Sequence, residues 1–356
     1  MSRASPNTAN VWMKCQASPR LAGLFPDLNP DSPERLEGRE WHAAAEALAK
    51  NGELVGTPEQ QDGAQMWVDA LVALGPLESW RIEKNVLCSA IHPEIPDGRP
   101  DALAIQDHWI RSADYKAGHG FVDEYEHWQQ VIYLLAVVKS RGVDYSRYQY
   151  STTVVQPRYY GPKPPVRTWE FTGAQLVQFE KAIVAAAEST RKGDAPARVG
   201  RWCGKCAGAR GCSLLNEAAA GIADWAGVAR PFDPVPSNIG AELRMLHIAQ
   251  KLLKDRTAAM EAQALHLLGT GVAIPGYEMD RAQSREAWLE PEKAINVAAM
   301  LGVDIAKPRE PITPAQARKK GIDEAVIKRY SHRPPGALKL QPVDFNHTKR
   351  IFENGK

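Results

Sequence analysis

The sequence predicts an α/β fold, in which a β-sheet is flanked by helices, followed by a mostly helical C-terminal region. Short apolar runs of strand length alternate with longer segments whose apolar residues recur at helical spacing. The 356 residues exceed the usual size of one domain, so we expect a large domain at 1–225 and a smaller, mainly helical one at 226–356. Residues 223–238, with three prolines and no clear period, read as the linker.

The overall composition is that of an ordinary globular protein. Hydrophobic residues make up 44% and charged residues 24%, and the net charge is +2, which is too small to indicate nucleic-acid binding by itself. The N-terminus has no apolar signal region, and no stretch has the roughly 18 apolar residues of a membrane span. We therefore expect a cytoplasmic protein with no membrane association.

Two helices are predicted in the first 75 residues, after a short helix and loop within residues 1–30. Residues 33–50 are rich in alanine and place Trp41, Ala45 and Leu48 on one stripe. His42 and Glu46 lie one turn apart on this helix, so an ordinary pairing between them is one interpretation of the histidine. A second helix is predicted to end at Gly75.

Three strands are predicted next, at 80–88, 100–106 and 109–116, with a tight turn at Asp107 and His108 between the last two. Because side chains alternate along a strand, Asp114 and Lys116 point to the same face. Asp101 lies at the start of the neighbouring strand and can reach the same end of the sheet. Two carboxylates and a lysine in this arrangement can hold a hard cation against a phosphodiester.

Further helices and strands follow in alternation. The pattern predicts a helix at 122–142, strands at 148–156 and 167–171, a helix at 173–193, and a long helix from Ile239 to Leu268. The first of these helices carries Gln129 and Tyr133, four residues apart.

Four short motifs occur in one order along the chain: Gly38-x-x-x-His42, Gly98-x-x-Asp101, Asp114-x-Lys116 and Gln129-x-x-x-Tyr133. Charged residues are common at solvated strand edges, so the Asp-x-Lys pattern alone does not define a site. The complete set resembles the RecB-like branch of the PD-(D/E)XK nuclease superfamily. This resemblance implies a restriction-endonuclease-like core with a central mixed sheet.

The resemblance also implies a role for each motif residue. His42, Asp101, Asp114 and the carbonyl of Tyr115 would bind Mg²⁺ or Mn²⁺, which prefer oxygen ligands and, for Mn²⁺, tolerate an imidazole. Lys116 would orient the attacking water and neutralise charge in the transition state. The side chains of Gln129 and Tyr133 would contact DNA or order the site; core packing is their ordinary alternative. Glu83 is an additional candidate carboxylate.

Three cysteines form a Cys203-x-x-Cys206-x5-Cys212 motif, which in a chain without an export signal indicates metal or cluster ligation rather than disulfides. The motif resembles that of RecB-like nucleases with an iron-sulfur cluster, and Cys15 fits the fourth ligand. The resemblance favours a [4Fe-4S] cluster; a structural Zn²⁺ site is the chemical alternative. Cys88 is expected to be a buried small hydrophobe.

These expectations lead to three functional hypotheses. The first is a Mg²⁺- or Mn²⁺-dependent DNA exonuclease of phage replication or recombination, since the part beyond residue 225 resembles an uncharacterised phage and prophage family of RecB-like proteins. The second is a catalytically idle DNA-binding protein or partner of a phage recombination or single-strand-binding protein. The third is a zinc-stapled interaction protein. Eight basic residues are expected to form either a DNA-facing surface or a solvated helix face: Arg309, Arg318, Lys319, Lys320, Lys328, Arg329, Arg333 and Lys339.

Overall fold

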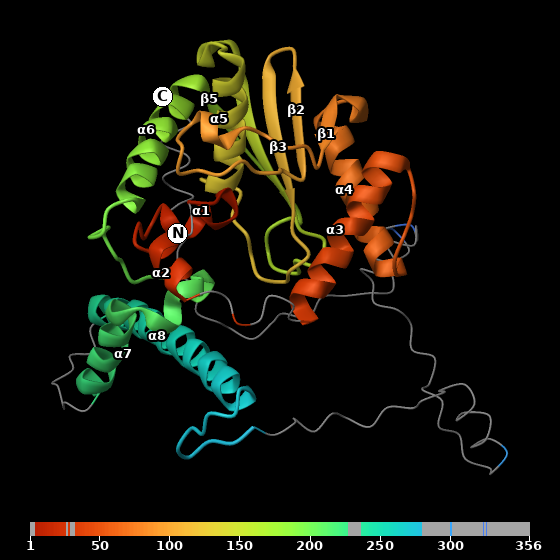
Figure 1. Ribbon diagram of the computed structural model, residues 1–356. Helices are drawn as coiled ribbons and strands as arrows, with labels where there is room; N and C mark the ends of the chain where they lie inside the picture. Colours follow the sequence, from red (N-terminus) through yellow and green to blue (C-terminus); the bar gives the residue numbers. More distant parts are fainter. Residues whose placement is uncertain are drawn as a thin grey trace. The chain divides into compact units, whose positions relative to one another are not determined.

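A five-stranded mixed sheet lies at the centre of the fold (Figure 1). Its strands follow the order of the chain: β1 (Trp80–Ile82), β2 (Ala102–Gln106), β3 (Trp109–Tyr115), β4 (Gln149–Val155) and β5 (Val166–Thr172). Neighbouring strands are antiparallel except β3 and β4, which are parallel. The sheet and its flanking helices confirm the predicted α/β fold.

The computed structural model describes residues 4–25, 28, 33–226 and 236–279, together with Met300, Asp323 and Ala325. The described residues up to Met279 belong to one compact unit, Met1–Asp280. The basic residues expected to face DNA between Arg309 and Lys339 lie outside the described residues. The domain boundary near residue 225 stays a prediction.

The connections between the strands follow from their directions. In the β2/β3 hairpin Gln106 pairs with Trp109, which leaves the predicted two-residue turn at Asp107 and His108. Parallel strands cannot be joined by such a turn and need a longer crossover. Helix α5 (Trp128–Arg141) supplies the crossover between β3 and β4.

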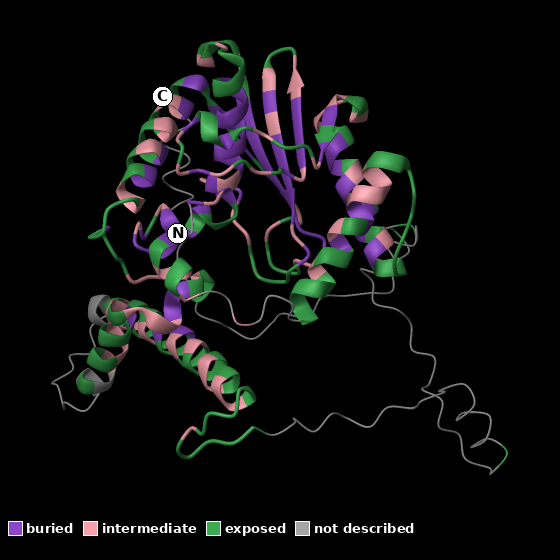
Figure 2. Cartoon of the chain, in the orientation of Figure 1, coloured by how far each residue is buried: buried purple, intermediate pink, exposed green. Residues whose placement is uncertain are grey.

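Helices cover both faces of the sheet, and the buried residues lie between the layers (Figures 1 and 2). Helices α5 and α6 (Gly173–Thr190) pack on one face, against Leu103 and Ile110. Helices α3 (Pro33–Asn51) and α4 (Pro58–Leu74) pack on the other, against Ala113 and Tyr115. The opposite faces taken by Ile110 and by Ala113 and Tyr115 confirm the predicted alternation along β3.

The two ends of this unit meet beside the sheet. The N-terminal part contains η1 (Pro6–Thr8), α1 (Ala9–Trp12) and α2 (Ser18–Leu24), and the later part contains the turns η5 (Cys203–Lys205) and η6 (Ala207–Gly211) with helices α7 (Ser213–Ala226) and α8 (Pro236–Gly269). Helix α2 packs on η6 so closely that a Cβ atom on Gly208 would lie 2.5 Å from that of Leu21. Arg256 on α8 donates to the carbonyl of Arg210 at 2.9 Å. The predicted long helix at 239–268 is therefore present, and it packs on the cysteine-bearing turns.

Three elements differ from the prediction. The strand expected at 80–88 ends at Ile82, because Glu83 has a left-handed backbone (φ 51°) that leaves the strand direction. The helix expected from residue 122 begins at Trp128, because the preceding segment is held by the sheet: Thr152 donates its hydroxyl to the Glu124 carbonyl at 3.0 Å. Part of the expected linker, up to Ala226, belongs to the unpredicted helix α7.

Within the described part of the chain, no helix combines the length and apolar character that a bilayer crossing requires.

The two motif glycines provide a matched test of packing. A Cβ on Gly98 would lie 2.7 Å from the buried ring of Tyr133, whereas a Cβ on Gly38, inside α3, would meet no atom within 4 Å. We expect Gly98→Ala to lower the free energy of unfolding by about 1–3 kcal/mol and Gly38→Ala to raise it by roughly 0.5–1 kcal/mol. Urea unfolding followed by circular dichroism measures both; a Gly98→Ala protein as stable as the unmodified one would contradict the packing described.

Candidate metal and nucleic-acid site

The two predicted aspartates lie on neighbouring strands at the same end of the sheet. Asp101 precedes β2 and Asp114 is the penultimate residue of β3. The backbone N–H of Tyr115 donates to Asp101 Oδ2 at 2.7 Å, which fixes the Asp101 carboxylate across the hairpin. Asp101 is half-buried and faces a cavity, while Asp114 is 3% exposed and lies deeper.

Asp114 is held by two cationic or protonatable partners. Lys116 Nζ lies 2.7 Å from Asp114 Oδ2, so the Asp-x-Lys motif forms an ion pair within itself. The imidazole of His127, which is also 3% exposed, has its Nε2 4.0 Å from the same oxygen. His127 was not singled out from the sequence, where it falls inside the helix predicted at 122–142; in the structure it directly precedes α5.

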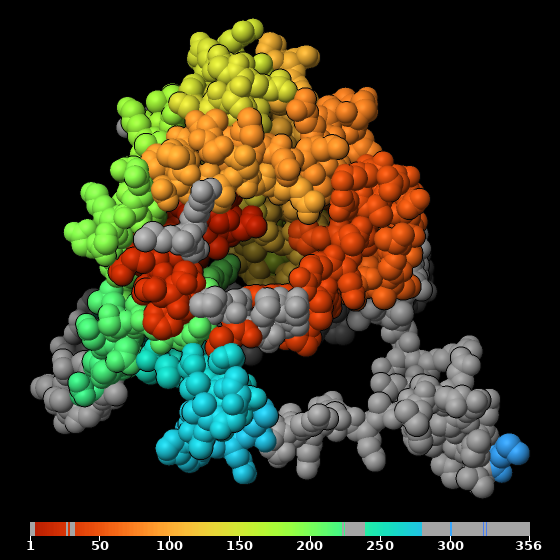
Figure 3. All heavy atoms as spheres, in the orientation of Figure 1, coloured from red at the N-terminus to blue at the C-terminus, as the bar shows by residue number. Residues whose placement is uncertain are grey.

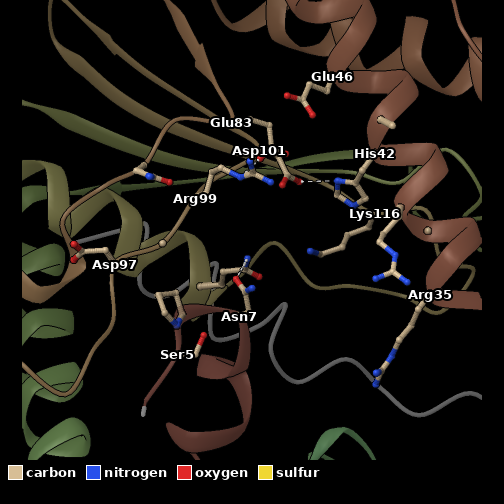
Figure 4. A pocket seen from close by; sticks show the side chains of 17 residues that line it. Ser5, Asn7, Arg35, His42, Glu46, Glu83, Asp97, Arg99, Asp101 and Lys116 are labelled. Atoms are coloured by element: carbon tan, nitrogen blue, oxygen red, sulfur yellow. Dashed lines mark hydrogen bonds and ion pairs between the residues drawn. The ribbon is translucent and has the colours of Figure 1, made fainter. Parts of the chain in front are cut away.

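His42, Glu83 and Asp101 form a group that can hold a metal ion. One ligand atom from each lies within 4.8 Å of the others. His42 Nδ1 is 3.7 Å from Asp101 Oδ2, and Figure 4 shows the imidazole pointing from α3 toward the Asp101 carboxylate. Glu46, the ordinary partner considered for His42, instead pairs with Lys50. The rings of His42 and Tyr115 pack in a T-shaped arrangement, with their centroids 5.4 Å apart.

This group of possible metal ligands differs from the predicted ligands, which were His42, Asp101, Asp114 and the Tyr115 carbonyl. Glu83, at first an additional candidate, joins the group because its left-handed backbone turns the chain at the end of β1, and its N–H donates to the Asp101 carbonyl at 3.0 Å. Asp114 is directed to Lys116 and is not in the group. The backbone of Tyr115 takes part through its N–H, which donates to Asp101. Metal binding by Asp114 and by the Tyr115 carbonyl stays a prediction.

The acidic groups affect one another's pKa values. Burial and the negative charge of Asp114 raise the pKa of Asp101. Burial also opposes ionisation of Asp114, but Lys116 and His127 outweigh it and hold the Asp114 pKa below its usual range. Burial and the nearby Asp101 raise the pKa of Glu83 to about 6, against the opposing charge of Arg99, whose Nε is 2.6 Å from Glu83. Such crowding of carboxylates is relieved by a bound cation.

Lys116 is a cation at neutral pH. Burial disfavours its charged form, but the carboxylates of Asp114 and Asp101 outweigh burial and raise the Lys116 pKa. His127 behaves in the opposite way, because burial lowers its pKa below the usual value. Lys116 therefore acts as a fixed positive charge and not as a general base.

His42, Glu83, Asp101 and Lys116 line a cavity of about 1120 Å³. Figure 3 shows it as a hollow between the red N-terminal segment and the orange helices. Its walls combine acidic and basic side chains: Glu46, Glu83, Asp97, Asp101, Arg35, Arg39, Arg99 and Lys116. Arg35, Arg39 and His42 follow one another at helical spacing on α3, so one side of that helix presents two guanidinium groups next to the metal-binding group.

Gln129 and Tyr133 reach the same cavity region from α5. Gln129 lines the cavity, and both side chains donate to Asn7 Oδ1, at 3.1 Å from Gln129 Nε2 and 3.0 Å from the Tyr133 hydroxyl. Asn7 also lines the cavity and was not singled out from the sequence. The structure therefore brings His42, Asp101, Lys116 and Gln129 to one cavity, with Asp114 and Tyr133 behind its wall.

The four candidate ligand cysteines lie where the two ends of the unit meet. Cys15 follows α1, and Cys203, Cys206 and Cys212 lie on or beside η5 and η6. All are free thiols. Their sulfurs do not form a group whose members all lie within 4.8 Å of one another; in the described residues that condition is met by His42, Glu83 and Asp101.

Each of the four sulfurs nevertheless has a backbone amide as a hydrogen-bond donor. Cys15 Sγ accepts from Arg198 N–H at 3.4 Å, Cys203 Sγ from Gly200 at 3.4 Å and Cys212 Sγ from Leu215 at 3.5 Å; the thiol of Cys206 has Gly208 as its backbone partner. Burial raises the pKa of Cys206 to about 11, so its thiolate needs a strong counter-charge to form. Cys88, by contrast, lies in the core with no exposed surface, as predicted, but in the 3₁₀ turn η3 (Cys88–Ala90) rather than in a strand.

Comparison with known proteins places the chain in a family. No curated protein matches the sequence. A solved structure described as "Crystal structure of SSO0001" aligns with 60% of this chain and 87% of that chain, at 13% identity and a TM-score of 0.33, a likeness too distant to bear on fold or function. The family model described as "Protein of unknown function (DUF2800)" matches residues 77–345. That match covers more than half of the chain, which therefore belongs to the DUF2800 family.

Proposed function

We propose that this protein is a metal-dependent deoxyribonuclease, an exonuclease that acts on DNA ends in phage replication or recombination. The observation that carries the proposal is the group of His42, Glu83 and Asp101, with ligand atoms within 4.8 Å of one another, in a cavity that also contains Lys116. The four RecB-like motifs of the sequence support it, because each of them brings a residue to this one cavity.

The donor set fits Mg²⁺ or Mn²⁺. Two carboxylates suit either ion, and the imidazole of His42 favours Mn²⁺. The raised pKa values of Asp101 and Glu83 fit the same conclusion, because both carboxylates carry an electrostatic cost that a divalent cation removes. A bound cation supplies positive charge that stabilises the phosphorane-like transition state and makes water more acidic.

The side chains of this chain then have separable roles. His42, Glu83 and Asp101 hold the cation, and the Tyr115 N–H keeps the Asp101 carboxylate in place. Asp114, kept ionised by the Lys116 ammonium, in turn fixes that ammonium beside the cavity. Lys116 neutralises charge on the reacting phosphate and orients the attacking water. The cavity arginines attract the DNA backbone.

The cysteines fit an iron-sulfur cluster better than a single zinc ion. A zinc ion with Zn–S bonds of about 2.3 Å draws all four sulfurs to one point. A [4Fe-4S] cluster would bind each sulfur through a different iron atom, so it would not require the four sulfurs to lie within 4.8 Å of one another, a condition that they do not meet. Amide donors to every sulfur suit thiolates that carry negative charge. A cluster at this place would join the two ends of the unit.

Replacing Lys116 tests the catalytic role. We expect Lys116→Ala to degrade linear DNA about 10²–10³ times more slowly than the unmodified protein, because one charged transition-state contact is lost. Lys181→Ala, which removes an exposed lysine of α6 away from the cavity, is the matched control and should keep full activity. Assays with Mg²⁺ and Mn²⁺ on linear and circular DNA measure both rate and end-dependence. Equal rates for the two variants contradict the proposal, as does DNA binding by the unmodified protein without turnover in either metal.

Replacing Glu83 tests the metal group through its pH dependence. The pKa of Glu83 is raised from 4.5 to about 6 in the folded chain, so protons compete with metal below that pH, and Mn²⁺ affinity should fall by about tenfold per pH unit there. The stability of the metal-free protein depends on pH in the opposite direction from metal affinity. Because the Glu83 pKa is raised on folding, the contribution of Glu83 to the free energy of unfolding is fully present below pH 4.5 and is lost as the pH rises through about 6.

Glu83→Gln should remove the contribution of Glu83 to both effects, while that of Asp101 remains, and should weaken Mn²⁺ binding at least about tenfold. Calorimetry and thermal unfolding with and without chelator measure these changes. Glu46→Gln is the control, since Glu46 lines the same cavity outside the metal group. Unchanged Mn²⁺ affinity in Glu83→Gln would remove Glu83 from the ligand set.

Replacing the cysteines singly tests the cluster. Cys15→Ala, Cys203→Ala, Cys206→Ala and Cys212→Ala should each lose iron and sulfide, together with absorbance near roughly 400 nm, after anaerobic purification. Cys88→Ala should keep both, because Cys88 is a core residue remote from the motif in sequence. Stoichiometric zinc without that absorbance would show a zinc site instead.

A further inference from the structure

The N-terminal segment forms one wall of the cavity. Ser5, Pro6 and Asn7 line it, and in Figure 4 the labelled Ser5 and Asn7 lie across the cavity from His42. The segment is fixed at both sides of this wall. The N–H of Ala4 donates to the Glu94 carbonyl at 3.1 Å, and Trp12 Nε1 donates to the Ser5 carbonyl at 2.9 Å.

The Asn7 side chain is oriented by α5. Its Oδ1 accepts from Gln129 Nε2 at 3.1 Å and from the Tyr133 hydroxyl at 3.0 Å. The Tyr133 side chain is 1% exposed, and its ring packs on Gly98, so it cannot easily follow a movement of Asn7. Because both groups donate, the Asn7 side chain is oriented with its carbonyl oxygen toward them and its NH₂ group on the other side.

The NH₂ group of the Asn7 side chain is available to a ligand of the cavity. With Oδ1 engaged twice, the remaining hydrogen-bonding capacity of Asn7 is its NH₂ group, which offers donors alone. Among the described residues this NH₂ group has no acceptor, and Asn7 is exposed on the cavity wall. A donor in a cavity that also contains Lys116 and Arg99 suits an anionic oxygen.

We propose that Asn7 forms a phosphate subsite, in which its side-chain amide donates to a phosphodiester oxygen of the DNA strand held in the cavity. Gln129 and Tyr133 are then positioning residues that act through Asn7 and do not themselves contact DNA. The inference rests on the proposed nuclease function, because it takes DNA as the ligand of the cavity. It adds a contact on the wall opposite the metal group, so that a strand is held from both sides.

Asn7→Asp and Asn10→Asp provide a matched pair of variants. Asn10 lies one turn further along the same segment, is also exposed, and uses its Oδ1 to accept from Trp128 N–H at 3.1 Å, but it does not line the cavity. In both variants the carboxylate keeps the acceptor and adds one negative charge. Only Asn7→Asp removes a donor from the cavity.

DNA affinity, measured by fluorescence anisotropy with a short labelled duplex and a single strand in Ca²⁺, separates the two variants. We expect Kd to rise at least about tenfold for Asn7→Asp, or ~1.4 kcal/mol, and to change less than about twofold for Asn10→Asp. Asn7→Leu, which removes the donor without adding charge, should raise Kd about fivefold or more. Thermal unfolding should show all three variants folded.

The outcomes distinguish this inference from the nuclease proposal. Unmodified protein that cleaves DNA, with Asn7→Asp equal to Asn10→Asp, overturns the subsite and leaves the nuclease intact. Loss of binding in Asn7→Asp with normal binding in Asn7→Leu shows charge repulsion alone and also overturns the subsite. If the unmodified protein neither binds nor cleaves DNA, both proposals are wrong.

Discussion

The arrangement of the candidate site depends on the β2/β3 hairpin. Its two-residue turn fixes the register in which Ala102 faces Ala113, and this register brings Asp101 within 2.7 Å of the Tyr115 N–H. A shift of the pairing by one residue would move every side chain of a strand to the other face. The apolar residues prevent such a shift, because Ile110 belongs to the core under α5 while Tyr115 belongs to the core under α3 and α4. Packing on both faces of the sheet therefore also positions its carboxylates.

That position has an electrostatic consequence. Two buried or half-buried aspartates near one another cannot both ionise without a counter-charge. The chain places positive charge beside one of the two aspartates more than beside the other. Lys116 and His127 lie beside Asp114, which stays ionised, whereas Asp101 and Glu83 have raised pKa values. The negative charge that is not balanced belongs to Asp101 and Glu83, which line the cavity, and the His42 imidazole points toward Asp101 from α3. A soluble cation would balance this charge, and the asymmetry is the physical basis of the metal site proposed above.

Local patterns were enough to predict the strands of the hairpin, the helices around the sheet and the face shared by Asp114 and Lys116. They did not predict the place of Glu83, because its left-handed backbone has no signal in a segment that alternates like a strand. His127 and Asn7 were missed for a different reason. Asn7 meets Tyr133 across 126 positions of the chain, and no periodicity reports a contact over such a separation. The start of α5 was placed too early because side chains of β4, and not the segment's own helix propensity, determine how the residues before Trp128 fold.

The same long-range contacts connect the two features that the sequence presents as independent, the acidic site and the cysteines. The segment that begins at Ala4 passes the cavity at Asn7 and reaches the cysteine region at Cys15, whose sulfur accepts from the Arg198 N–H. Its buried residues Ala9 and Trp12 lie in the core under α5, so the segment cannot slide independently of that helix. A cluster that binds Cys15 would hold one end of the cavity wall, and Gln129 and Tyr133 would hold the middle. Under the two proposals, a cluster at the cysteines would affect the cavity through the position of Asn7, without any contact between the cluster and DNA.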